Sequence, residues 1–181
     1  MRYFFIQQDK ELPCAIQYRD FDINGGRHVF SKQDAGRLND SVVLYLKGSG
    51  REARWDFLQS PVTMFDERFR DILEAYEPNL FFQEVVLIHK ENALQYQYVH
   101  TLMEQVDAVS DKTEYYPNGT VKRLVLDSSK IGRHNLFLLG GSHRKDPIVS
   151  LALAESLLRR QSIGICLEEV DKWKPGFDSR V

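Results

Sequence analysis

The chain has 181 residues, of which 43% are hydrophobic and 28% are charged, and its formal net charge is −2. A single domain of this length buries roughly 70% of the surface that its unfolded chain exposes, and the apolar content is that of a folded protein. We therefore expect one domain over residues 1–181. Because acidic and basic residues are mixed and nearly balanced, the composition excludes the charge-dominated binding typical of nucleic-acid partners.

The apolar segments are short. Residues 1–9 hold about four apolar residues before polar ones, whereas a signal-peptide core needs about 7 to 15. The longest apolar stretch, residues 80–88, is interrupted by Gln83 and Glu84 and falls short of the ~20 residues that span a bilayer. We therefore expect a cytoplasmic protein without a membrane partner.

Residues 1–50 form a β-rich N-terminal part. The patterns predict strands over residues 3–7, 15–18 and 41–46, and the last of these is rich enough in β-branched residues for a buried strand. Glycine pairs at 25–26 and 48–50 mark turns between them.

Residues 61–88 predict a strand, a helix and a second strand. Residues 62–65 suit a buried strand, and Asp66 is a favourable N-cap. One helix face then carries the apolar residues Phe69, Ile72, Leu73 and Tyr76. Pro78 ends the helix, and residues 80–88 are apolar enough for a strand buried on both faces.

The middle of the chain predicts mostly β-structure. Residues 94–109 alternate like a strand at first and then take helical spacing, so we expect a strand followed by a short helix. Asn118-Gly119 between the apolar runs 115–116 and 121–126 predicts a hairpin. A further strand is predicted over residues 136–139, before a glycine-rich loop.

Residues 148–170 repeat the order of strand, helix and strand. Ser150 is the expected N-cap, Leu153 and Leu157 face inward, and residues 163–167 begin the second strand. An offset of 84 residues aligns Asp66 with Ser150 without gaps, and the same offset aligns the apolar positions of the two helices. This order is common in α/β proteins, so chance recurrence stays an alternative to duplication. We predict an α+β fold in which a mixed sheet holds two related strand-helix-strand units, 61–88 and 148–170, plus hairpins.

The motifs for cofactors, metals and catalysis are incomplete. Residues 48–53 fit G-x-G-x-x-A, but about ten residues remain before Pro61 for the helix that a dinucleotide site requires. The loop 140–145 lacks the spacing of a phosphate-binding loop, and the five histidines form no HExxH or H-x-H pair. Cys14 and Cys166 lack CxxC spacing, so we expect both to be reduced and buried. We expect no cofactor, no metal and no catalytic residues.

The C-terminal segment predicts a surface for a protein partner. After the expected last strand come Glu168, Glu169, Asp171 and Trp173. An exposed tryptophan beside acidic residues is typical of a binding patch, because tryptophan dominates many hot spots and charge steers encounter. In the alternative interpretation, Trp173 folds back on the core. The aromatic groups at residues 96–98 and 115–116 are expected to pack in the core, since no basic groove accompanies them.

Several patterns within residues 50–170 are shared with one protein family. They are Asp66-Glu67-Arg68-Phe69 at a helix start, paired tyrosines at residues 96–98 with Val106-Asp107-Ala108-Val109, and a second helix start at 150–153 followed by Gly164-Ile165-Cys166-Leu167-Glu168. With these patterns the chain resembles a bacterial immunity-protein family of polymorphic toxin systems, immunity family eleven. The resemblance implies a non-enzymatic protein that binds and blocks a cognate toxin. Two alternatives stay open, an enzyme whose site is built from scattered residues and a structural or regulatory binding subunit.

Overall fold

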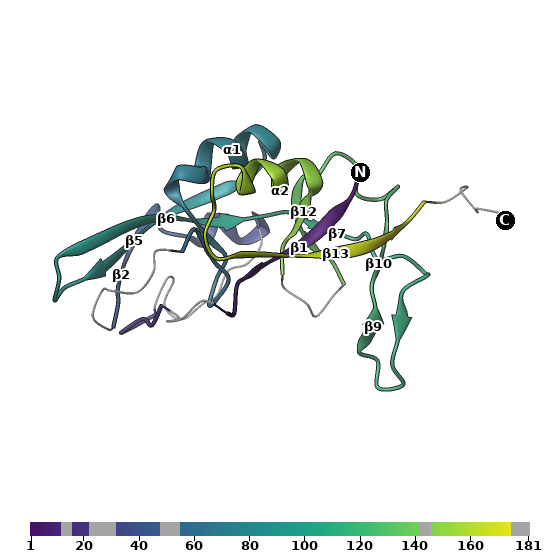
Figure 1. Ribbon diagram of the computed structural model, residues 1–181, viewed down its shortest axis with the longest axis horizontal. Coiled ribbons are helices and arrows are strands. Elements are labelled where there is room, and N and C mark those ends of the chain that lie inside the picture. The colour runs from purple at the N-terminus through teal and green to yellow at the C-terminus, as the bar shows by residue number, and fades with distance from the viewer. Residues whose placement is uncertain (12–15, 22–31, 48–54, 142–145, 175–181) are drawn as a thin grey trace.

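The strands form two sheets and a separate hairpin in the computed structural model (Figure 1). The model describes residues 1–11, 16–21, 32–47, 55–141 and 146–174. The larger sheet has six strands in the order β10 (Val125–Asp127), β13 (Ile165–Trp173), β1 (Tyr3–Gln8), β12 (Ile148–Ser150), β11 (Leu136–Leu139) and β7 (Gln105–Val106). The smaller sheet has five strands in the order β2 (Ser41–Tyr45), β5 (Phe81–His89), β6 (Leu94–Leu102), β4 (Met64–Asp66) and β3 (Phe57–Leu58). The hairpin pairs β8 (Glu114–Tyr115) with β9 (Val121–Arg123).

Both sheets combine parallel and antiparallel pairs. In the larger sheet β13 runs parallel to β10 and antiparallel to β1, and in the smaller sheet β5 runs parallel to β2 and antiparallel to β6. The chain is therefore a mixed α/β fold made mostly of strands, as the composition and patterns predict. The prediction of a single mixed sheet was wrong, because the two helix-bearing regions contribute their strands to different sheets.

Helices α1 (Arg70–Tyr76) and α2 (Leu151–Leu158) lie side by side on one face of the molecule (Figure 1). A 3-10 turn, η2 (Glu67–Phe69), leads into α1, and the Asp66 side chain caps it by accepting a hydrogen bond from the Arg68 amide at 3.1 Å. Ser150 caps α2 by accepting from the Leu153 amide at 3.3 Å. Both predicted N-caps are confirmed. A short 3-10 helix, η1 (Lys32–Arg37), lies elsewhere in the chain.

One apolar cluster joins both helices to both sheets. The predicted helix stripe is confirmed, because Phe69 and Leu73 are fully buried and Ile72 and Tyr76 pack against the same cluster. Its other members come from β1, β3, β4, β6, β11, β12 and α2, together with Met103 directly after β6. Two further clusters cover the opposite faces of the larger and the smaller sheet. Because the first cluster spans all of these elements, the described residues form a single compact fold.

The bounds of the strands coincide at the predicted offset. Adding 84 to the bounds of β4 (64–66) gives those of β12 (148–150), and adding 84 to those of β5 (81–89) gives those of β13 (165–173). In each region a third strand separates the two in the sheet, β6 between β4 and β5 and β1 between β12 and β13. A common origin of the two regions stays a prediction.

Two strands are less buried than their composition predicts. In β5 the buried residues are Gln83, Val85, Leu87 and His89, which alternate with more exposed ones, so this strand is covered fully on one face only. In β2 only Leu44 is buried, since the strand lies at the edge of its sheet. The predictions of a buried strand at residues 41–46 and of a strand buried on both faces at residues 80–88 were therefore wrong.

The predicted helix within residues 94–109 is absent. The chain instead forms the nine-residue strand β6, which pairs along its whole length with β5, and then the short strand β7. Pairing with β5 satisfies the backbone of β6 on one side, and β4 pairs with it on the other. Tertiary pairing therefore outweighs the local helical spacing.

The remaining predictions concern the N-terminal part and the cysteines. The predicted strand at 15–18 is reduced to a single bridge between Tyr18 and Leu46, and residue 15 and the turns at 25–26 and 48–50 lie outside the described residues. Cys166 is exposed on β13, so the prediction that it is buried was wrong, whereas Cys14 lies outside the described residues. No helix of the described chain is long and apolar enough to cross a membrane.

Candidate functional site

A groove of about 560 Å³ lies between the β8–β9 hairpin and strand β13. Residues 119–124 of the hairpin form one wall, and residues 168–171 of β13 form the other. Phe5, Val109 and Val170 contribute apolar surface to it. Figure 1 shows the hairpin extending away from the body of the molecule, so this groove is one of its outlying surfaces.

The groove exists because β9 and β10 diverge from each other after a single residue. β10 pairs in parallel with residues 171–173 of β13 and so belongs to the larger sheet. β9 precedes it by one residue, Leu124, but pairs with β8 in the separate hairpin. The chain therefore passes from the hairpin into the larger sheet at Leu124, and the space between the hairpin and β13 is the groove.

Hydrogen bonds fix the conformation of the hairpin turn. The Gly119 amide donates to the Tyr116 carbonyl at 2.9 Å, and Gly119 has φ +81°, a value that glycine adopts without strain. The Asn118 side chain accepts from the Thr120 amide at 3.1 Å. The hairpin predicted from Asn118-Gly119 is confirmed.

Exposed aromatic residues mark the hairpin beside the groove. Tyr115 is 54% exposed and Tyr116 is 51% exposed. Both were predicted to pack in the core, which was wrong, although Tyr98 is buried as predicted. Their exposure could have been predicted from their position next to the turn. Residues beside a hairpin turn lie at the tip of a two-stranded ribbon, away from the core.

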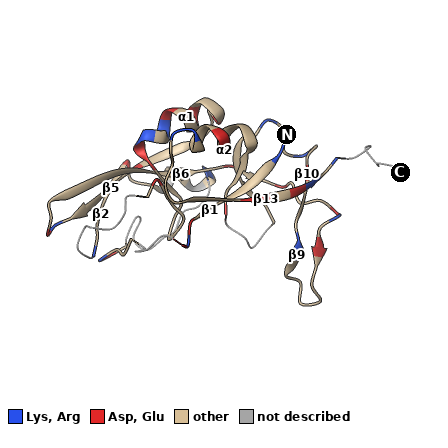
Figure 2. Cartoon of the chain, viewed as in Figure 1, with Lys and Arg blue, Asp and Glu red and all other residues tan. Residues whose placement is uncertain are grey.

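Ion pairs connect the hairpin to the body. The Arg123 guanidinium donates to Asp171 of β13 at 2.7 Å and lies 3.8 Å from the Glu114 carboxylate, and Lys122 donates to Glu114 at 3.0 Å. On the other side of β13, Arg2 donates to Glu169 at 2.6 Å. Figure 2 shows acidic and basic segments on β13 and on the hairpin. All of these side chains are solvent-exposed, so the pairs orient the hairpin more than they stabilise the fold.

These contacts have a predicted effect on titration. Lys122 holds the pKa of the Glu114 carboxyl below its usual value, mainly through its hydrogen bond. The pair therefore favours the folded chain above the usual pKa of a glutamate, and this contribution disappears as the pH falls through the lowered pKa. Replacing Lys122 with methionine is expected to raise the midpoint of Glu114, measured by carboxyl-carbon NMR.

Glu169 supplies the control for that titration. Arg2 lowers the pKa of Glu169 by a hydrogen bond in which Lys122 takes no part. Its midpoint is expected to stay unchanged in the Lys122→Met variant. A Glu114 midpoint that does not move would show that the contact with Lys122 does not persist in solution.

Strand alternation divides the four predicted partner-binding residues. Glu168, Glu169, Asp171 and Trp173 all belong to β13, so the prediction that they follow the last strand was wrong. Glu168 lies opposite Phe5 and shares its face of the sheet, whereas Glu169 lies opposite Phe4 on the face that carries the helices. Glu168, Glu169 and Asp171 nevertheless all line the groove.

Trp173 lies outside the groove lining. It is half-buried at the end of β13, where its carbonyl accepts from the Ser128 amide at 2.9 Å and Lys112 lies 5.7 Å from the centre of its ring. The half-buried tryptophan therefore matches neither of the two predicted environments, the exposed patch or the core.

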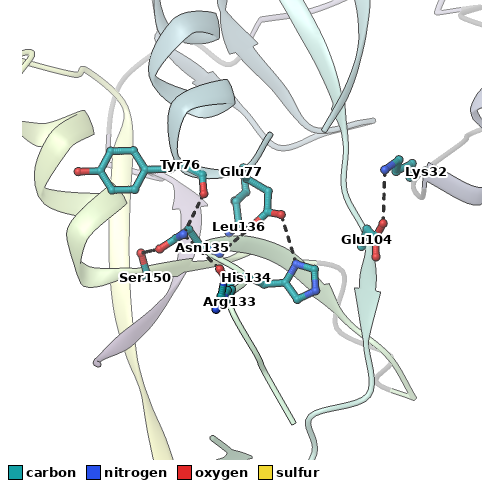
Figure 3. A network of polar contacts seen from close by, with 9 residues as sticks. All are labelled: Lys32, Tyr76, Glu77, Glu104, Arg133, His134, Asn135, Leu136 and Ser150. Carbon is teal, nitrogen blue, oxygen red and sulfur yellow. Dashed lines mark hydrogen bonds and ion pairs between the residues drawn. The ribbon is translucent and has the colours of Figure 1, made fainter. Parts of the chain in front are cut away.

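A second polar cluster joins α1 to the larger sheet (Figure 3). The buried Glu77 carboxylate accepts from the Asn135 amide at 2.8 Å and lies 3.3 Å from His134 Nδ1. The Asn135 side chain donates to the Tyr76 carbonyl at 2.8 Å and accepts from the Ser150 hydroxyl at 2.8 Å. Asn135 therefore connects the end of α1 with the cap of α2.

The buried carboxylates are hydrogen-bonded to the main chain. Each of the four that are buried in the described chain accepts a hydrogen bond from a main-chain amide, namely Asp56 from Ile163, Asp66 from Arg68, Glu77 from Asn135 and Asp127 from Ser129. Asp56 also accepts two hydrogen bonds from the Arg68 guanidinium, at 2.6 and 3.1 Å. Within the described chain, no group of three or more histidines, cysteines and acids is arranged to hold a metal.

Comparison with known proteins gives no family. No protein-family model matches the chain. A search of curated proteins finds no match either. The groove and the tyrosines beside it are therefore the features from which a function is inferred.

Proposed function

We propose that this chain is a non-catalytic immunity protein that binds and neutralises a cognate bacterial toxin in the cytoplasm. The observation that carries the proposal is the groove beside β13, with Tyr115 and Tyr116 exposed next to it. Tyrosines supply large contact areas at low entropic cost and are enriched among the residues that dominate binding energy. An inhibitor needs only such a complementary surface.

The charges around the groove suit a protein partner. Acidic residues of β13 and basic residues of the hairpin face the same space, so both signs of charge surround an apolar floor. Interfaces between proteins typically combine an apolar centre with a polar rim. The resemblance to the immunity family covers residues 50–170, which include the hairpin and both helix-bearing regions. Because members of that family bind toxins, we propose a toxin as the partner.

The proposal includes a duplication within the chain. The constant offset of 84 residues between strand bounds, and the N-caps Asp66 and Ser150 at equivalent positions, support a common origin of the two strand-helix-strand units. The family patterns begin at the same two helix starts. A duplicated unit is therefore proposed as the scaffold that carries the hairpin.

Co-expression tests the proposed function. The protein encoded by the neighbouring gene is produced alone and together with this chain, and growth and complex formation are measured. We expect growth arrest by the neighbour alone, rescue by this chain and a stable complex. A neighbour that is harmless alone, or that arrests growth despite this chain, contradicts the proposal. A regulatory subunit would form the complex without rescuing growth.

Alanine substitution of both tyrosines tests the surface. The double variant Tyr115→Ala and Tyr116→Ala is expected to weaken toxin binding by roughly 30-fold or more, measured by calorimetry, because two hot-spot side chains are removed. Its thermal unfolding is expected to match that of the unmodified chain, since both side chains are exposed. Val43→Ala is the control, because Val43 is 51% exposed on the other sheet. If the Val43→Ala variant lost binding and the tyrosine variant did not, the interface would lie at β2 and not at the hairpin.

A further inference from the structure

The backbone of β13 directs its hydrogen-bonding groups alternately to its two sides. The Asp9 amide donates to the Gly164 carbonyl at 2.9 Å, on the side of β1. The Ser128 amide donates to the Trp173 carbonyl at 2.9 Å, on the side of β10. Because the amide and carbonyl of one residue in an antiparallel strand share a direction, even-numbered residues from 164 to 170 face β1 and odd-numbered residues face outward.

The outward side of β13 is only partly covered. β10 pairs with residues 171–173 and covers Asp171 and Trp173. Leu167 and Glu169 direct their amides and carbonyls to the same side, and no strand of the described chain pairs with them there. An uncovered strand edge is a template for pairing with another extended chain.

This uncovered edge continues into the groove. The groove is lined by residues 168–171 of β13, so it begins where β10 stops covering the edge. β10 already lies along that edge in parallel orientation, which shows that the edge accepts a strand. A segment that continued the line of β10 would enter the groove, with alternate side chains on the face of the sheet that carries Glu168 and Val170.

We infer that the toxin binds by adding an extended segment of its chain as a strand to the outer edge of β13, with apolar side chains at alternate positions facing the groove floor. This inference rests on the proposed function and specifies how the partner is held. Main-chain hydrogen bonds to Leu167 and Glu169 supply the pairing, and the groove selects the side chains, as in other cases of strand addition.

Hydrogen exchange at single amides tests the inference directly. In the free protein the amides of Cys166, Glu168 and Val170 are expected to be protected, and those of Leu167 and Glu169 to exchange at least roughly tenfold faster. In the complex with an inactive variant of the neighbouring gene's product, the last two amides are expected to become protected. A complex in which they still exchange rapidly overturns strand addition and leaves the proposed function intact, whereas failure to form any complex contradicts the proposed function.

A proline substitution removes the pairing group itself. Glu169→Pro deletes an outward amide that no described strand uses, so the edge position tolerates it better than an interior one. The affinity for the toxin is expected to fall roughly tenfold or more, because the variant loses one main-chain hydrogen bond and the proline ring obstructs the strand edge. Glu169→Ala is the matched control, since it removes the same side chain and its contact with Arg2 but keeps the amide, and its loss of affinity is expected to be clearly smaller than that of the proline variant. Equal losses in both variants overturn the inference.

A peptide library provides a test that needs neither a toxin nor the proline variant. Random linear seven-residue peptides displayed on phage are selected on the intact protein, and the selected peptides are synthesised. We expect binders that protect the amides of Leu167 and Glu169 from exchange and that carry apolar residues at alternate positions. Binders that protect other amides, or the absence of binders, count against strand addition at this edge.

Discussion

Replacing Leu157 with alanine is expected to lower the free energy of unfolding by about 2–5 kcal/mol. Leu157 is 1% exposed and belongs to the cluster that joins both helices to both sheets. The substitution removes buried apolar surface and leaves a cavity that its neighbours, among them Leu73, fill only partly. Urea unfolding followed by circular dichroism measures the change.

The adjacent Leu158 provides the control for that measurement. It lies in the same helix with the same side chain, but it is 46% exposed. Leu158→Ala is expected to change the free energy of unfolding by less than about 0.5 kcal/mol. Similar losses for the two leucines would mean that α2 does not present Leu157 to the core.

Replacing Glu77 with alanine is expected to cost about 2–4 kcal/mol. The Glu77 side chain is 7% exposed and accepts from the Asn135 amide, with a longer contact from the Leu136 amide at 3.5 Å (Figure 3). Its removal leaves these donors inside the protein without their acceptor, and an unsatisfied buried donor is costly. The same unfolding experiment measures the loss.

Glu104 is the matched control for Glu77. It also forms one ion pair, with Lys32 at 3.4 Å, but its side chain is 46% exposed (Figure 3). Glu104→Ala is expected to change stability by less than about 1 kcal/mol, since water replaces the lost contact. If both glutamates cost the same, the polar cluster around Asn135 contributes no more than a surface pair.

The helices and the hairpin could be predicted because their signals are local. Asp66 and Ser150 cap the first turns with their own side chains, and the stripe from Phe69 to Tyr76 requires only helical spacing. Asn118-Gly119 determines its turn within four residues. In each case the residues that cause the structure are neighbours in the sequence.

The predictions were wrong where pairing with a strand distant in the sequence determines the secondary structure or the burial of a segment. Within residues 99–106, which have helical spacing, β6 pairs with β5 and β4 and β7 pairs with β11, so strands form instead of a helix. The edge position of β2 exposes a β-branched run. The candidate site fails for the same reason. Pairing with β1 and β10 extends β13 to Trp173, which no local pattern reveals, and strand alternation then places Glu168 and Glu169 on opposite faces.

Ion pairs cross the gap beside Leu124, where the chain passes from the hairpin into the larger sheet, so the orientation of the hairpin is expected to depend on ionic strength. One residue separates β9 from β10, and the contacts from Arg123 to Asp171 and Glu114 cross the gap between hairpin and body. At physiological salt the screening length is about 8 Å, longer than these contacts, whereas at 1 M salt it shrinks to about 3 Å. Concentrated salt is therefore expected to weaken the ion pairs that orient the hairpin, whereas the apolar clusters that hold the two sheets are not screened.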